Sequence, residues 1–169
     1  MNLGQTSNTS EEFVTLDGHH CIIDKYNFIF DPWPEHHNLD TYGGKQILKL
    51  ENEPLFAELV ILRLLEKQGY QGVWVDTYRN KFWRQLPCLS IPVEPDKLLL
   101  DVIDKIYLNK GGRRSGCFDI IAYRDTSFVF AELKKCKADR IRQSQIEWFM
   151  AAQTIGLDNP RFFIAEWTI

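Results

Sequence analysis

The feature that most constrains the fold is the stretch of residues 115–134, SGCFDIIAYRDTSFVFAELK, which predicts two β-strands around a tight turn. An apolar run is followed by turn-forming residues and then by a second run rich in aromatic and β-branched residues. Side chains alternate between the faces of a strand, so the even-numbered residues from Phe128 to Lys134 are expected on one face. Glu132 and Lys134 therefore project together at the end of an otherwise apolar strand.

Asp119 opens the first strand of this hairpin, and strand pairing is expected to bring it beside Glu132 and Lys134. Two converging carboxylates supply the oxygen ligands that Mg²⁺ and Mn²⁺ prefer in proteins. With an ammonium next to them, they are the working parts of a Mg²⁺-dependent phosphodiesterase.

The pattern Asp119…Glu132-x-Lys134 resembles that of the PD-(D/E)xK nuclease superfamily. The segment 132–148, ELKKCKADRIRQSQIEW, is similar to its VRR-NUC branch, in which the Glu-x-Lys strand leads through a turn into a helix bearing a Gln and then a Trp. The resemblance covers roughly residues 111–167. Phe118 stands where the family usually has a proline, which is a backbone device and not a ligand. The resemblance implies an α/β (α+β) fold with a restriction-endonuclease-like mixed central sheet flanked by helices.

The same resemblance implies the roles of the hairpin residues. Asp119, Glu132 and the Leu133 carbonyl would hold one Mg²⁺ or Mn²⁺ ion, and Lys134 would orient the attacking water or the scissile phosphate. More loosely the resemblance extends over residues 53–78, where related nucleases carry a metal-site glutamate on the first helix.

Carried over, this helix glutamate is Glu58, as a further catalytic and metal-binding residue. The alternative is a solvent-facing glutamate that pairs with Arg63 or Lys67 on the same helix.

The last helix is expected over residues 139–155 and to end at Gly156. Ile141, Gln145 and Trp148 step by four and three, so Gln145 is a polar residue on an otherwise apolar stripe. A buried amide needs hydrogen-bond partners, which either the metal-site end of the sheet or backbone groups would supply. The first alternative makes Gln145 a catalytic-site residue.

Charge is unevenly distributed along the chain, whose net charge is −3. Residues 110–142 carry nine Lys or Arg against four Asp or Glu, a balance of +5 that leaves −8 for the remainder. Local positive potential around the site is what phosphate binding requires, although a solvated basic face is the alternative. The expected nucleic-acid-binding residues are Lys110, Arg113, Arg114, Lys135, Lys137, Arg140 and Arg142.

Turn and capping residues divide the rest of the chain. Pro54 suits the first turn of a helix that Gly69 ends, and Asp96 is a good N-cap for an inserted helix. The expected elements are a helix over 54–68, a strand over 71–78, a loop or short edge strand over 79–95, a helix over 96–109 and a closing strand over 161–167.

Residues 1–44 are expected to form an N-terminal arm, partly disordered over the first ten residues and with a small hairpin around Asp17-Gly18. The arm has no counterpart in the resemblance, and capping the sheet, a subunit contact and a substrate contact are the alternatives for it. Residues 45–169 would form the VRR-NUC-like nuclease domain.

Composition limits the classes of protein to consider. A chain of 169 residues with 44% hydrophobic residues is expected to form one domain with a sizeable core. The sequence has no apolar run of membrane-spanning length and no signal-peptide pattern, so we expect a cytoplasmic protein without a membrane partner. The four scattered cysteines are expected to be reduced, and zinc is disfavoured for the pairs His19-His20 and His36-His37, because adjacent residues do not share a face.

The resulting hypothesis is a Mg²⁺- or Mn²⁺-dependent nuclease that hydrolyses phosphodiester bonds in DNA, branched or flapped, in repair or recombination. It would find its substrate through a homodimer or a protein partner. Two alternatives stand beside it: a catalytically inactive nucleic-acid-binding or assembly module on the same fold, and an unrelated α+β core whose Glu-x-Lys is accidental.

Overall fold

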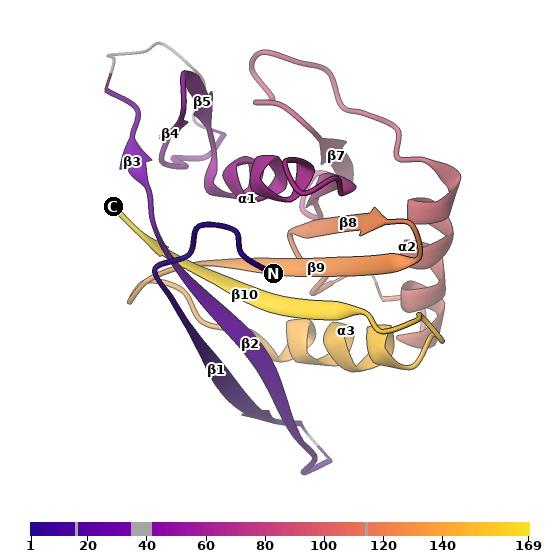
Figure 1. Cartoon of the computed structure of the whole chain (residues 1–169). Coiled ribbons are helices and arrows are strands. Elements are labelled where there is room, and N and C mark those ends of the chain that lie inside the picture. The colour runs from indigo at the N-terminus through magenta and orange to yellow at the C-terminus, as the bar shows by residue number, and fades with distance from the viewer. Residues whose placement is uncertain (16, 35–41, 114) are drawn as a thin grey trace.

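The protein has a mixed α/β (α+β) fold in the computed structural model, which describes residues 1–15, 17–34, 42–113 and 115–169. Within these residues, a seven-stranded mixed sheet, a three-stranded sheet and three helices are present (Figure 1). The mixed central sheet flanked by helices, predicted from the sequence, is thereby confirmed. The elements are β1 (Ser7–Val14), β2 (His20–Ile29), β3 (Asp31–Pro32), β4 (Leu48–Leu50), β5 (Glu53–Leu55), α1 (Ala57–Glu66), β6 (Gln71–Asp76), β7 (Lys81–Trp83), α2 (Lys97–Asn109), β8 (Ile120–Arg124), β9 (Ser127–Lys135), α3 (Gln143–Gln153) and β10 (Arg161–Thr168).

Strand order in the large sheet is β1-β2-β10-β9-β8-β6-β7. The strands β8 and β9 are the predicted hairpin, with Arg124 opposite Ser127 across the turn. β10 runs parallel to β9, and β6 runs antiparallel to β8. Therefore β6, β9 and β10 all end, and β8 begins, at the same end of the sheet.

Different helices cover the two faces of the sheet, with α1 on one face and α2 and α3 on the other (Figure 1). The alternation predicted for β9 explains this arrangement. Val129 and Ala131 belong to the core cluster that contains α1, whereas Phe130 packs against Trp148 of α3 with ring centroids 5.4 Å apart. One strand thus contributes to both halves of the core.

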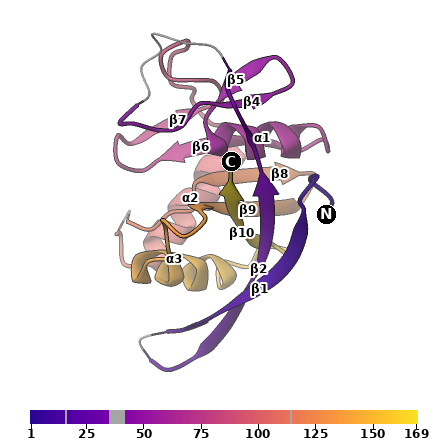
Figure 2. The same ribbon diagram turned by 90° about the vertical axis from the view of Figure 1, so that its left-hand side faces the viewer.

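The N-terminal segment, expected as an arm over residues 1–44, adds β1 and β2 to one edge of the central sheet, which is the sheet-capping alternative considered for it. β1 and β2 form the predicted hairpin, which extends away from the body of the molecule (Figure 2). β2 also pairs in parallel with β10. Within the first ten residues, which were expected to be partly disordered, Leu3 is buried and β1 begins at Ser7. Local composition could not reveal this, since the pairing partner lies at the other end of the chain.

The histidine pairs considered for zinc lie in this N-terminal part. His19 and His20 are exposed on the β1–β2 hairpin. His36 and His37 lie outside the described residues.

Helix α1 begins at Ala57, three residues after the predicted start at Pro54. Pro54 lies in β5, at an edge of the three-stranded sheet, where its missing N–H is tolerated. Glu51 has φ 56° in the turn between β4 and β5. The buried side chains of Leu55 and Phe56 keep the chain extended into the core before the helix starts.

The two later helices follow their capping residues. Helix α2 agrees with the prediction, and the Asp96 side chain accepts a hydrogen bond from the Leu99 N–H at 3.0 Å. Helix α3 begins at Gln143, four residues later than predicted. The Asp139 carboxylate accepts from the Lys135 N–H at 3.2 Å, so Asp139 closes the turn after β9 and does not start the helix.

The region 79–95 contains the short edge strand β7, one of its two predicted forms.

All four cysteines are free thiols. Among the described residues, no helix is both long enough and apolar enough to span a bilayer.

Candidate phosphodiesterase site

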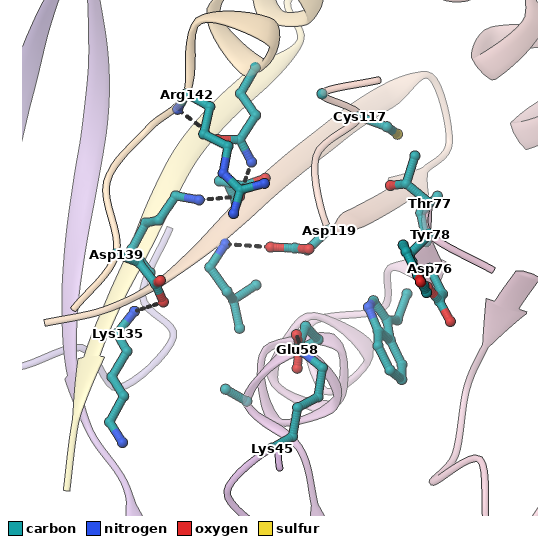
Figure 3. Close-up of a pocket in the computed structure, with 18 of the residues that line it drawn as sticks. Lys45, Glu58, Asp76, Thr77, Tyr78, Cys117, Asp119, Lys135, Asp139 and Arg142 are labelled. Atoms are coloured by element: carbon teal, nitrogen blue, oxygen red, sulfur yellow. Dashed lines mark hydrogen bonds and ion pairs between the residues drawn. The ribbon is translucent and has the colours of Figure 1, made fainter. Parts of the chain in front are cut away.

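The predicted catalytic and metal-binding residues lie around one open cavity of about 830 Å³ at the end of the sheet where β6, β9 and β10 end (Figure 3). The first turns of α1 and α3 reach the same cavity, which brings in Glu58 and Gln145. All five predicted catalytic residues line it: Glu58, Asp119, Glu132, Lys134 and Gln145.

Strand pairing fixes the position of Asp119. Its carbonyl accepts from the Val75 N–H at 2.7 Å, and its carboxylate Oδ2 accepts from the Leu133 N–H at 2.9 Å. Ile120, the first residue of β8, pairs with Ala131 of β9. Asp119, one residue earlier, therefore lies beside Glu132. The hairpin therefore brings the two carboxylates together, as the sequence pattern predicted.

Glu132 is 2% exposed and uses one carboxylate oxygen for two hydrogen bonds. Oε1 accepts from the Lys134 ammonium at 2.7 Å and from the Gln145 side-chain amide. Oε2 is buried and has no hydrogen-bond partner among the residues that the structure describes. A buried carboxylate oxygen without a partner is costly, so this atom is a candidate ligand for a cation.

The Gln145 amide has partners of both kinds considered for it, the Glu132 carboxylate and a backbone group. Its Oε1 accepts from the Arg142 N–H at 2.9 Å, while its Nε2 donates to Glu132. This amide joins the start of α3 to the carboxylate on β9.

Both hairpin carboxyls are held in an environment that disfavours their charge. Burial, reinforced by the Glu58 charge, raises the pKa of Asp119 to about 6. Burial and the charge of Asp119 also raise the pKa of Glu132 well above its ordinary value, against the opposing effect of Lys134. Strongly raised carboxyl pKa values in a cavity are typical of functional sites, and a bound cation would relieve the repulsion.

Glu58 is buried at 6% exposure and faces the cavity, so the alternative of a solvent-facing glutamate is wrong. Its carboxylate pairs with the Lys45 ammonium. Burial disfavours the charged form of Lys45, but the carboxylates of Glu58, Asp119 and Asp76 together outweigh burial and raise the pKa of this lysine.

The two residues considered as partners of Glu58 pair with other acids. Arg63 pairs with Glu53 at 3.0 Å and with Glu66 at 2.9 Å, and Lys67 pairs with Glu51 at 2.5 Å.

The carboxylate oxygens of the site are ligands of the kind that Mg²⁺ and Mn²⁺ prefer. However, the described residues contain no group of three or more Asp, Glu, His or Cys side chains close enough together to hold a metal ion. Lys45 and Lys134 hold two of the carboxylates in ion pairs. The orphaned Glu132 Oε2 still fits a hard cation. Leu133, predicted to contribute its carbonyl, lines the cavity.

The predicted nucleic-acid-binding residues do not form one surface. Lys135 and Arg142 are exposed and line the site cavity, whereas Lys137 and Arg140 line a neighbouring depression. Arg113 is exposed in the loop before β8. Arg114 lies outside the described residues.

Lys110 was expected on an exposed, flexible basic loop, but it is 7% exposed. Its ammonium donates to the carbonyls of Ser115 and Ser144, the latter at 3.1 Å. Gly116, with φ 81°, lies so close to α3 that a Cβ there would stand 2.0 Å from the Ser144 oxygen. These contacts of Lys110 and Gly116 hold the loop against the start of α3. Lys110 is therefore not available to a phosphate.

Sequence reasoning missed the side of the cavity formed by Tyr42, Lys45, Asp76 and Arg79. Asp76 gave a usable signal, since it ends the apolar strand run GVWVD. Lys45 gave none, because its partner lies thirteen positions away on α1.

Comparison with known proteins adds no assignment: no family model, no curated protein and no solved structure matches the chain.

Proposed function

We propose that this protein is a Mg²⁺- or Mn²⁺-dependent nuclease that hydrolyses phosphodiester bonds. The observation that carries the proposal is the meeting of Asp119, Glu132 and Lys134 in one open cavity, with a buried Glu132 oxygen that lacks a partner. Glu58 and Gln145 reach the same cavity from two separate helices. Paired carboxylates beside an ammonium are suited to hydrolysing a phosphate ester.

In this proposal Asp119, Glu132 and the Leu133 carbonyl hold the cation, with Glu58 as a further carboxylate. The bound ion supplies positive charge for the phosphate and lowers the pKa of a water. The ion pair between Lys45 and Glu58 must be released before Glu58 can reach the ion. Lys134 pairs only with Oε1 of Glu132 and leaves Oε2 without a partner for the ion.

Lys134 is placed to hold the scissile phosphate or the attacking water. Lys134 is 8% exposed and its ammonium lies 2.7 Å from Glu132, so its position is fixed before substrate arrives. Gln145 keeps the Glu132 carboxylate in place through its amide. Such preorganised charge and hydrogen bonding lower the barrier more than mobile groups could.

Among the described residues that line the cavity, the charges balance without a cation. Five basic side chains (Lys45, Arg79, Lys134, Lys135 and Arg142) face five acidic ones (Glu58, Asp76, Asp119, Glu132 and Asp139). A divalent ion would make the cavity positive, so we propose that phosphate binding depends on the cation. Lys135 and Arg142, both exposed, are then the residues that contact the phosphate backbone of the nucleic acid.

The assignment to the VRR-NUC branch of the PD-(D/E)xK superfamily, with its restriction-endonuclease-like fold, is part of this proposal. So are a DNA substrate, a cytoplasmic location, and a homodimer or protein partner that delivers the substrate.

A second candidate function is a nucleic-acid-binding or assembly module without catalysis. One observation favours it: within the described part of the chain the carboxylates are paired with lysines and form no ready group of three metal ligands. Such a module has no reason to keep a divalent-cation site.

Cleavage and cation binding test the two candidates. We expect the wild-type protein to cleave DNA with Mg²⁺ or Mn²⁺, and Asp119→Ala or Glu132→Ala to lower the rate by about 10³-fold or more. Asp101→Ala, which removes an exposed acid of α2, is the matched control and should cleave normally. Calorimetric titration with Mn²⁺ should show binding to the wild type.

No cleavage of single-stranded, flapped or branched substrates would refute the nuclease proposal. The absence of Mn²⁺ binding as well would favour the inactive module.

A further inference from the structure

Tyr78 is an aromatic side chain held in solvent at the rim of the site cavity. It is 91% exposed and lies in the turn that follows β6, next to the buried Asp76. Most of its ring surface is therefore open to a ligand. Flat rings of this kind are the usual platforms on which proteins stack unpaired nucleic-acid bases.

The turn that carries Tyr78 is fixed on both sides. The Asp76 carboxylate accepts from the Arg79 N–H at 3.1 Å and from the Tyr42 hydroxyl. The Arg79 guanidinium stacks on the Tyr42 ring at 3.7 Å from its centroid and pairs with Asp76 at 3.6 Å. It also lies over the Tyr78 ring at 5.5 Å. A platform on a fixed turn loses little conformational freedom when a base stacks on it.

Tyr78 and the basic residues lie on opposite sides of the proposed cation site. In Figure 3, Asp76, Thr77 and Tyr78 are on one side of Asp119, while Lys135 and Arg142 are on the other. A strand whose phosphate reaches Asp119 therefore has cationic groups for its backbone on one side and an open ring on the other.

We propose that Tyr78 stacks an unpaired base of the substrate, next to the phosphate that is cleaved. The bases of a continuous duplex are covered on both faces by their neighbours, so this contact requires a single strand, a flap or an unpaired nucleotide at a branch. The inference rests on the proposed function and specifies its substrate class. It also assigns Arg79 as a positioning residue, which holds the turn through Asp76 and Tyr42.

Fluorescence of a short DNA single strand that carries 2-aminopurine tests the stacking. Binding is measured in Ca²⁺, to separate it from cleavage, and compared with binding to a duplex of the same sequence. We expect the wild type to quench the probe, and Tyr78→Ala to weaken single-strand binding by roughly 5- to 100-fold with loss of quenching. Tyr78→Phe keeps the ring and should bind and quench like the wild type. Leu108→Ala, at a residue of α2 that is 77% exposed, is the control for removing an exposed apolar group.

The outcomes separate the inference from the function on which it rests. If wild type cleaves DNA and Asp119→Ala does not, but Tyr78→Ala binds and quenches as the wild type does, the stacking role is refuted and the nuclease proposal stands. Equal loss of duplex and single-strand binding in Tyr78→Ala also refutes it, because the ring would then not select unpaired bases. A wild-type protein that binds no nucleic acid overturns both proposals.

Discussion

Replacing Asp119 by Asn should make the metal-free protein more stable at neutral and alkaline pH. Asn keeps an oxygen that accepts the Leu133 N–H hydrogen bond now made at 2.9 Å, but it removes a charge that burial and Glu58 disfavour. Loss of this charge also removes a repulsion on the Glu132 carboxylate, whose pKa the charge of Asp119 raises. The substitution therefore separates the stability of the fold from the chemistry of the site.

The magnitude follows from the pKa of Asp119, which burial raises to about 6 in the folded protein, against about 3.9 in the unfolded chain. Two pKa units correspond to about 3 kcal/mol, and roughly 1–3 kcal/mol remains once water near this half-buried carboxyl is allowed for. Because the folded pKa is the higher one, the stabilising contribution is present below about pH 4 and is lost as pH rises through about 6. At pH 8 Asp119→Asn should then melt several degrees above the wild type, at roughly 2–4 °C per kcal/mol.

Thermal unfolding from pH 4 to pH 8, with EDTA or with Mn²⁺, measures the pH-dependent stability difference and the stabilisation by bound Mn²⁺. In EDTA the two proteins should melt together near pH 4, diverge between about pH 4 and pH 6, and keep a constant difference above that range. Mn²⁺ should stabilise the wild type at pH 8, by about 2.7 kcal/mol at one hundred times its dissociation constant, and should not stabilise Asp119→Asn. Asp101→Asn, at an exposed acid, is the control. A variant less stable than wild type at pH 8 in EDTA, or one equally stabilised by Mn²⁺, would refute the reasoning.

Three further results are expected. Lys134→Ala should retain Mn²⁺ binding by calorimetry but lose about 10²- to 10³-fold in single-turnover cleavage, since its ammonium is a fixed charge beside Glu132; normal turnover would remove it from the mechanism. Gly116→Ala should lower the free energy of unfolding in urea by about 3 kcal/mol or more, because its Cβ would stand 2.0 Å from the Ser144 oxygen. Gly112→Ala, also at positive φ but in open space, should cost only about 1 kcal/mol, and equal losses would argue against the close approach. DNA affinity should rise when Ca²⁺ is added and fall steeply with salt, measured by fluorescence anisotropy; a flat salt response would contradict phosphate contacts by Lys135 and Arg142.

Local periodicity and capping residues predicted most of the helices and strands around the site, and the residues that share its faces, from the sequence alone. The alternation along β9 placed Glu132 and Lys134 together on the face opposite Val129, and the hairpin brought Asp119 to them. The spacing on the last helix put Gln145 on its apolar side, and left open whether the amide meets the site or backbone groups; it contacts both. These features depend on spacings of two, three and four residues, which any short segment of sequence displays.

Only the tertiary structure decided which distant groups meet. β2 pairs with β10 from the opposite end of the chain, Lys45 and not a neighbour on α1 neutralises Glu58, and Lys110 turns inward to the loop carbonyls. An ammonium on a long side chain can satisfy its charge with any acid or carbonyl within reach, and that choice is set by which elements the core packs side by side. The sequence therefore determined the groups that lie close together along the chain, and the packing determined which distant groups join them at the cavity.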